Sequence, residues 1–119
     1  MWYIATLMVR CTVGAQQTGP WTVEEQIRLV EAEDEDIAYD KALEFGRRQA
    51  QSYENDQGAT VKWECIGLED LEWMVDERIQ DGAQVRARFL KRDDPTALIT
   101  PKNELVVFKS RRPGNGQEG

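Results

Sequence analysis

The feature that most constrains the fold is the alternation of residues 2–13, which repeats with a period of two. This period is typical of a β-strand, whose successive side chains point to opposite faces of a sheet. One alternate set is apolar apart from a tyrosine hydroxyl: Tyr3, Ala5, Leu7, Val9, Cys11 and Val13. The other set is half apolar: Trp2, Ile4, Thr6, Met8, Arg10 and Thr12. The run predicts a long strand with apolar side chains on both faces.

A second strand is predicted over residues 21–32. Its alternation puts Val23, Ile27 and Leu29 on one side and mostly polar residues on the other. A connection of only seven residues, which contains the breaker Gly19-Pro20, separates the two runs. Such a short connection favours an antiparallel hairpin, since parallel strands need a longer crossover.

An amphipathic helix is predicted after this hairpin. Asp34 suits the N-cap, and the acidic residues that follow favour the positive end of the helix dipole. Helical periodicity then continues for about 20 residues, roughly 30 Å. Its apolar side comprises Ala38, Tyr39, Ala42, Leu43, Phe45, Gly46, Ala50 and Tyr53. The turn-forming residues 55–58 end the helix.

The rest of the chain predicts further strands. Residues 60–75 and 83–90 alternate, and Gly67 indicates a bulge in the first of these runs. Residues 97–100 and 105–109 form a short terminal hairpin in this interpretation. The prediction is an α+β, two-layer domain over residues 1–109 and a flexible C-terminal tail over 110–119. Its antiparallel sheet has β-β-α-β-β order, with one long amphipathic helix on one face and the short C-terminal hairpin.

One helix covers only one face of such a sheet. Trp2, Ile4 and Met8 point away from the cleaner apolar face of the first strand, so they need another cover. The C-terminal segment, a second copy of the chain or a different protein can supply it. Because contiguous exposed apolar surface marks interaction sites, these three residues form the candidate interface.

The chain of 119 residues has no histidine and two cysteines. A Ser-His-Asp or Cys-His site, a histidine metalloprotease and a four-thiolate metal site are therefore excluded. Helix capping accounts for the acidic run at residues 34–36, so we expect no metal site and no cofactor. Cys11 and Cys65 lie in strand-like runs, where two buried thiols and one disulfide are both open interpretations.

Charge limits the partners, because 22 acidic and 15 basic residues give a net charge of −7. Residues 83–112 differ, with eight basic and three acidic side chains. These can contact phosphate or pair with the acidic remainder, and without an RNA-recognition or KH signature we do not expect nucleic acid as a partner. The apolar start at residues 2–9 is too short to span a membrane and lacks a signal-peptide pattern, which predicts a cytoplasmic protein without a membrane partner.

Several short patterns resemble one family. They are Trp2-Tyr3-x-Ala5-x-Leu7, Glu24-Glu25-x-Ile27-x-Leu29, Ala32-x-Asp34-Glu35-x-x-Ala38-x-x-x-Ala42, Tyr53-x-Asn55-x-x-Gly58-x-x-Val61-x-Trp63 and Asp81-Gly82-x-x-Val85. Together they are similar to the bacterial domain-of-unknown-function family 4288 over residues 2–90. The resemblance implies a small single-domain bacterial protein without an established activity or known catalytic residues.

The pattern around Tyr53, Asn55 and Trp63 has two interpretations. In the structural one, Asn55 ties down the end of the helix, Gly58 supplies a positive φ, and the two aromatic residues pack across the corner. In the functional one, the corner is an aromatic-lined pocket for a small molecule or peptide, with Asn55 as its polar group.

These observations lead to a non-enzymatic protein-interaction module as the first hypothesis. A small acidic protein can capture a basic partner by electrostatic steering, and an immunity or antitoxin-like protein is one version. The alternative is a small-molecule binder or minor enzyme that uses the Tyr53–Trp63 corner with Glu64 nearby. A homodimer through Trp2, Ile4 and Met8 is the third hypothesis.

Overall fold

A computed structural model describes residues 1–109 of the chain. The chain divides into two compact units, and the boundary lies between Ala87 and Arg88. The sequence predicted one domain over residues 1–109, and the structure adds a boundary inside that range. The predicted tail over 110–119 lies outside the described residues. We describe each unit by itself.

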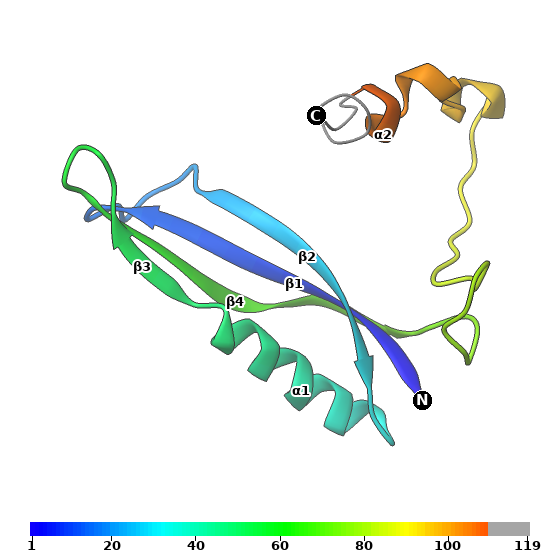
Figure 1. Cartoon of the computed structure of the whole chain (residues 1–119), viewed down its shortest axis with the longest axis horizontal. Coiled ribbons are helices and arrows are strands. Elements are labelled where there is room, and N and C mark those ends of the chain that lie inside the picture. Colours follow the sequence, from blue (N-terminus) through cyan, green and yellow to red (C-terminus); the bar gives the residue numbers. More distant parts are fainter. Residues whose placement is uncertain (110–119) are drawn as a thin grey trace, which may run out of the picture. The chain divides into compact units, whose positions relative to one another are not determined.

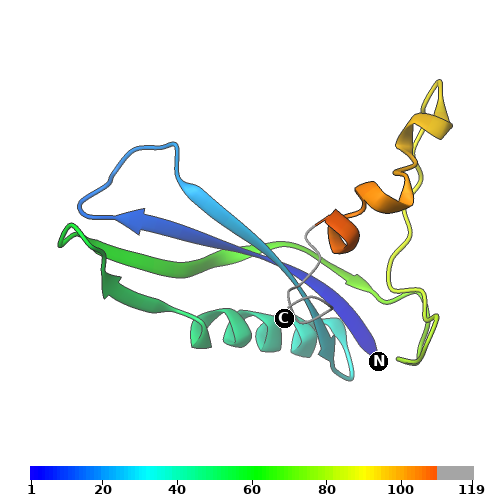
Figure 2. The ribbon, with the colours of Figure 1, turned by 45° about the horizontal axis from the view of Figure 1, so that its top comes forward.

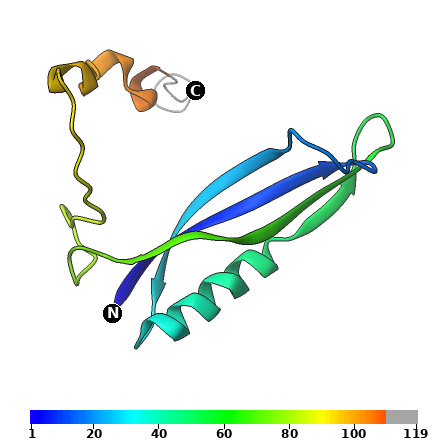
Figure 3. The same ribbon diagram turned by 180° about the vertical axis from the view of Figure 1, so that it is seen from behind.

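The first unit is an antiparallel sheet with one helix on one of its faces (Figures 1 and 2). Its elements are β1 (Trp2–Val13), β2 (Thr22–Glu31), α1 (Glu35–Arg48), β3 (Gln51–Glu54) and β4 (Thr60–Trp73). The strand order is β2-β1-β4-β3, so β1 lies between β2 and β4 (Figure 3). The antiparallel α+β fold is confirmed, as are the first two strands to within a residue.

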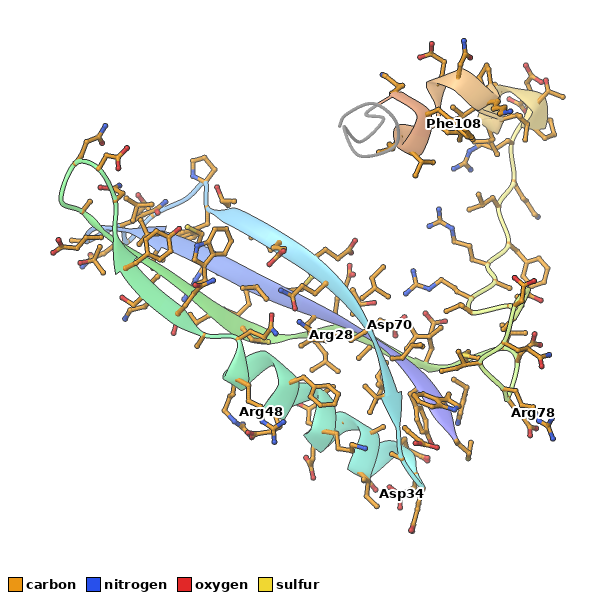
Figure 4. All side chains as sticks on the ribbon, in the orientation of Figure 1. Arg28, Asp34, Arg48, Asp70, Arg78 and Phe108 are labelled. Atoms are coloured by element: carbon orange, nitrogen blue, oxygen red, sulfur yellow. The ribbon has the colours of Figure 1, made fainter. Side chains whose placement is uncertain are left out.

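The helix begins where the sequence predicted and ends earlier. The side chain of Asp34 accepts a hydrogen bond of 2.9 Å from the backbone N–H of Ile37, which confirms the N-cap. The helix spans 14 residues rather than about 20 and ends at Arg48 (Figure 4). Tyr53, predicted on the helix, lies on β3, because residues 51–54 pair with residues 60–63 of β4. The prediction of a long amphipathic helix was therefore wrong after Arg48.

The core lies between α1 and the sheet. Its buried members are Tyr3, Ala5, Leu7, Val30, Ala32, Ala38 and Ala42, and Phe45, Cys65, Leu68 and Leu71 pack against them. The row of small residues brings the helix close to the strands. A Cβ at Gly46 would lie 2.5 Å from Sγ of Cys65 and 3.1 Å from Cδ2 of Leu7, so glycine alone fits there. The apolar alternate set of β1 is the face that the helix covers.

Strand β4 is irregular where it pairs with β1. The register shifts between Met8 and Val9 and again between Thr6 and Leu7, and Gly67 has a φ of 142°. The predicted bulge at Gly67 is confirmed. The two extra residues turn Leu68 and Leu71 toward the helix, opposite Leu7 and Ala5.

The predicted strand over residues 83–90 does not form. Only two backbone bonds join this segment to the end of β4, from Val75 N to Val85 O and from Asp76 N to Gln84 O. Asp81-Gly82 does turn the chain, and Gly82 has a φ of 86°. The order β-β-α-β-β is present, but the two strands after the helix are β3 and β4. The sequence assigned the residues of β3 to the helix because they also fit its periodicity.

The second unit contains helical turns where the sequence predicted a hairpin. They are two 3-10 helices, η1 (Pro95–Leu98) and η2 (Lys102–Glu104), and the short helix α2 (Val106–Lys109). Pro95 and Pro101 stand at the start of the two 3-10 turns, where a fixed φ suits a helical start. Local bonds such as Ala97 N to Asp94 O use backbone groups that a hairpin would need. The C-terminal hairpin was wrong for this reason.

Candidate functional site

The candidate site is the face of the sheet opposite α1, which we call the open face. Residues that are paired directly across two strands point to the same side. Val23, Ile27 and Leu29 of β2 pair with Arg10, Thr6 and Ile4 of β1, which alternate with the core residues. Since the core residues face α1, the apolar side of β2 faces away from the helix. The sequence identified this side of β2, and the pairing register shows which way it faces.

Four apolar residues of the open face are exposed. The exposed fractions are 45% for Val23, 55% for Ile27, 39% for Leu29 and 54% for Ile66. Ile66 is the residue of β4 that the register shift between Met8 and Val9 leaves without a partner on β1, and its exposure places it outside the core that α1 covers. Ile27 and Leu29 are neighbours on this face of β2, Glu25 separates them from Val23, and Ile66 lies on β4 beyond β1. We call these four residues the apolar column.

The middle of the open face is covered by the chain itself. Nε of Arg86 donates a hydrogen bond of 2.8 Å to Oε2 of Glu72, and its Nη2 donates one of 3.2 Å to Oγ1 of Thr6. The backbone bonds between residues 75–76 and 84–85 hold this segment in place. Thr6 is consequently buried, at 3% exposure. The open face is therefore closed over β1 and uncovered along β2.

The three predicted interface residues differ in how deeply they are buried. Ile4 is buried at 1% exposure, whereas Trp2 and Met8 are half-buried. A change of Ile4 to aspartate would bury a carboxylate, so it would test folding rather than dimer formation. The interface through Trp2, Ile4 and Met8 stays a prediction. The exposed apolar surface on this side of the sheet lies on β2 and at Ile66.

Acidic side chains surround the apolar column. On β2, Glu25 lies between Val23 and Ile27 and Glu31 follows Leu29 on the same face, and Asp70 lies on β4 opposite Thr6. The whole first unit, residues 1–87, contains 18 acidic and eight basic side chains, a net charge of −10. The surface around the column therefore carries a negative potential that attracts cationic groups.

A hollow of about 330 Å³ lies at the end of the sheet near the N-terminus. Its lining combines two indole rings with three carboxylates: Met1, Trp2, Glu31, Trp73, Met74, Asp76 and Glu77. Trp2 pairs with Glu31, and the ring of Trp73 lies 6.4 Å from that of Tyr3. Aromatic faces and carboxylates together suit an ammonium or guanidinium group. The sequence alone does not indicate this hollow, because its residues come from distant segments that only the strand pairing brings together.

The structure brings Tyr53 and Trp63 together across β3 and β4. Nε1 of Trp63 donates a hydrogen bond of 3.3 Å to the hydroxyl of Tyr53. The side-chain oxygen of Asn55 accepts bonds from the backbone N–H groups of Gln57 and Ala59, at 2.9 and 3.0 Å. Asn55 therefore ties down the β3–β4 turn, in which Gly58 has a φ of 79°, and not the end of the helix as predicted. The side-chain oxygen of Asn55 therefore already accepts two hydrogen bonds from the backbone.

A shallow hollow of about 320 Å³ adjoins this corner. It is lined by Ala50, Gln51, Ser52, Lys62, Trp63 and Glu64. Glu64, the carboxylate that the sequence placed near the corner, is thus one of its walls. The hollow offers one indole face, one cation and one carboxylate to a ligand.

The two cysteines are free thiols in the structure. Cys11 is buried, and Cys65 is half-buried with its Sγ 3.7 Å from the carbonyl oxygen of Gly67. This decides between the two open interpretations in favour of separate thiols. Among residues 1–109, no three Cys, Asp or Glu side chains lie where they could hold one metal ion.

One carboxyl group outside the open face has a perturbed pKa. Arg47 donates hydrogen bonds of 3.1 and 2.6 Å to Oε1 of Glu44 and holds the pKa of that carboxyl below its ordinary value. Arg48 contacts the other oxygen at 3.3 Å and acts in the same direction. This cluster lies on the solvent side of α1, so it bears on the helix and not on the candidate site.

The fold and the site define a class: a small antiparallel α+β domain with one helix-covered face and one partly open face. The chain belongs to the family described as Domain of unknown function (DUF4288), whose family model matches residues 2–87. The match ends where the first structural unit ends, at Ala87. Among curated proteins and among solved structures, none matches the chain. Within residues 1–109, no helix combines the length and the hydrophobicity that crossing a membrane requires.

Proposed function

We propose that this chain is a non-enzymatic protein-interaction module that binds a partner through the open face. The observation that carries the proposal is the apolar column Val23, Ile27, Leu29 and Ile66, each between 39% and 55% exposed. Isolated exposed apolar residues are common on soluble proteins, but three on one face of one strand, interrupted only by Glu25, form an apolar strip. Covering such a strip removes apolar area from water and so favours association.

The partner we propose is a basic protein with an apolar segment. The net charge of −10 on the first unit would steer a cationic partner toward it. The hollow lined by Trp2, Trp73 and three carboxylates would accept one lysine or arginine side chain beside the column. An immunity or antitoxin-like protein that neutralises a basic toxin in the bacterial cytoplasm is one form of this function.

The test is native mass spectrometry of the tagged chain recovered from its host at low salt, followed by binding assays with the recovered protein. Ile27→Ser should weaken binding at least about tenfold, because a central apolar contact is lost. Ile37→Ser is the matched control, since Ile37 is 42% exposed on α1 and does not belong to the open face. Equal binding by the two variants would contradict the proposal, and so would binding that is insensitive to salt.

A second candidate function is small-molecule binding at the Tyr53–Trp63 corner. The hydrogen bond between the two aromatic residues and the adjoining hollow favour it. It predicts that a metabolite changes the tryptophan fluorescence of the wild-type chain and that Trp63→Ala abolishes this change. A metabolite screen that shifts neither fluorescence nor melting temperature would rule this function out.

A further inference from the structure

Strand β2 is a long and regular sheet edge. It is the first strand in the order β2-β1-β4-β3, so within the described residues only β1 pairs with it. Ten consecutive residue pairs join it to β1 without a register shift, from Trp2 and Glu31 to Cys11 and Thr22. The opposite edge differs, because β3 has four residues and β4 carries two shifts. A long edge without a bulge is a template for another strand.

The backbone groups that β2 presents outward can be assigned. Met1 and Ala32 exchange both backbone hydrogen bonds, at 3.1 and 2.9 Å. Because such pairs alternate in an antiparallel ladder, the even-numbered residues of β2 bond to β1. The odd-numbered residues Val23, Glu25, Ile27 and Leu29 therefore direct their N–H and C=O groups away from the sheet. The carbonyl of Glu31 agrees with this phase, since it accepts a hydrogen bond from Nζ of Lys41.

The sequence of β2 does little to block strand addition. Natural sheet edges are commonly protected by lysine, proline or a bulge, and none of these occurs within Thr22–Glu31. The protection is limited to the carboxylates of Glu24, Glu25 and Glu31 and to Lys41, which covers the end of the strand. Carboxylates repel other carboxylates and accept cations, so they select the register of an added strand more than they prevent one.

Two copies of β2 can pair about a two-fold axis in only a few registers. Because the odd-numbered residues carry the outward backbone groups, an odd-numbered residue of one copy must pair with an odd-numbered residue of the other. The two-fold axis then passes at the position of one residue and not between two residues. An axis at Glu24 or Glu25 brings that glutamate against itself, and an axis at Arg28 does the same for the arginine. An axis at Ile27 places Glu25 opposite Leu29 and Glu24 opposite Val30. None of these registers places opposite charges across from one another.

An axis at Gln26 gives a self-complementary register. Arg28 of one copy then lies opposite Glu24 of the other, twice, and Leu29 lies opposite Val23, twice. The groups involved already lie in one row: Arg28 donates to Oε1 of Gln26 at 2.9 and 3.1 Å, and Gln26 donates to Oε1 of Glu24 at 2.8 Å. Figure 4 shows Arg28 on this strand. Of the registers considered, this one alone places opposite charges across from one another, and its remaining pair sets Glu25 opposite Ile27, twice.

We propose that the chain forms a homodimer in which β2 pairs antiparallel with β2 of a second copy, with the two-fold axis at Gln26. Val23, Glu25, Ile27 and Leu29 of each copy make the backbone bonds. Two sheets of four strands become one continuous sheet. A two-fold axis perpendicular to the sheet keeps both open faces on the same side, so the two apolar columns meet. The dimer does not depend on the proposed function, because a chain that binds no other protein can still form it.

The test uses charge reversal at the two ends of the predicted pair. Arg28→Glu alone and Glu24→Arg alone each place like charges opposite one another, so each should raise the dimer dissociation constant at least about tenfold. A mixture of the two single variants restores two opposite-charge pairs in a heterodimer. Native mass spectrometry over a concentration series measures the products against the 13.7 kDa monomer, with an affinity tag on one variant to mark the heterodimer.

The expected result is a wild-type dimer, two weakened single variants and a heterodimer that forms from their mixture. Circular dichroism and the melting temperature check that each variant is folded, and the double variant Arg28→Glu with Glu24→Arg should dimerise like the wild type. A wild-type chain that stays at 13.7 kDa at every concentration would overturn the proposal. A dimer that both single variants leave unchanged would also overturn it, because the copies would then meet elsewhere.

Discussion

The two faces of the sheet are made by the same strands, yet they differ in what covers them. The covered face packs Leu7 and its neighbours against a helix whose contact residues are small, down to Gly46. The open face is closed over β1 by the Arg86 segment and uncovered along β2, where Ile27 is 55% exposed. Apolar side chains of one sheet thus stabilise the fold where the helix covers them and stay exposed to solvent where nothing covers them.

The two edges of the sheet repeat this contrast. The edge at β3 and β4 is short and interrupted by bulges, which makes it a poor template for strand addition. The edge at β2 is regular, and its outward backbone groups are those of four odd-numbered residues. The surfaces that we assign to binding are thus the open face and its β2 edge.

The largest expected effect comes from the covered face. Leu7→Ala removes a fully buried side chain and should lower the free energy of unfolding by about 3 kcal/mol, within the usual range of 2–5. Ile27→Ala on the open face should change it by less than about 1 kcal/mol. Denaturant unfolding measures both variants. Equal losses would mean that the open face is part of the core, and the contrast between the faces would fail.

Proline at adjacent positions of β2 tests the edge. Gln26→Pro removes an N–H that bonds to β1, so it should destabilise the chain by roughly 2–3 kcal/mol. Glu25→Pro removes an outward N–H and should leave the melting temperature of the monomer nearly unchanged, while it prevents strand addition. Thermal melts at low protein concentration compare the two. A larger loss for Glu25→Pro would reverse the assigned hydrogen-bond phase.

Gly46→Ala tests how closely the helix approaches the sheet. The added methyl group would meet Sγ and Cβ of Cys65 at 2.5 and 2.8 Å, so either the helix or β4 has to shift. We expect a loss of about 1–2 kcal/mol, since overpacking outweighs the better helix propensity of alanine. Combining it with Cys65→Ala should recover part of the loss, because the closest atom is removed. A stabilised Gly46→Ala variant would show that the helix lies farther from the sheet.

The smallest expected effect is electrostatic and lies on the solvent side of α1. The pKa of Glu44 is lowered by the hydrogen bond and charge of Arg47, so its contribution to stability is present above the ordinary value of 4.5. The contribution is lost as the pH falls through the lower pKa of the folded chain. Glu44→Gln should therefore melt slightly below the wild type at pH 7, and the difference should vanish in acid. A difference that grows in acid would contradict the sign of the shift.

Much of the covered face could be predicted from the sequence. Alternation gave the first two strands, and the capping role of Asp34 fixed the start of the helix because both signals are local. The end of the helix could not be found in this way. Tyr53 fits the apolar side of a helical wheel and also fits a strand, and only its pairing with Val61 decides between them.

The open face was harder to predict because it depends on strand pairing. Val23, Ile27 and Leu29 were recognised as one side of a strand, but only the register with β1 shows that this side faces away from α1. Ile4 was predicted to be in an interface, and its burial depends on the rest of the chain around it. The hollow beside Trp2 and Trp73 could not be predicted at all, since these two residues are 71 positions apart in the sequence.

Binding of a partner through the open face is tested most directly by a methyl NMR titration of the labelled chain with the partner recovered from the host. We predict that the methyl signals of Val23, Ile27, Leu29 and Ile66 shift, while those of the buried Leu7 and of Ile37 on α1 do not. Keeping the concentration of the labelled chain constant separates this effect from self-association. Shifts that occur around Tyr53 and Trp63 or along α1, with the signals of the apolar column unchanged, would contradict binding through the open face.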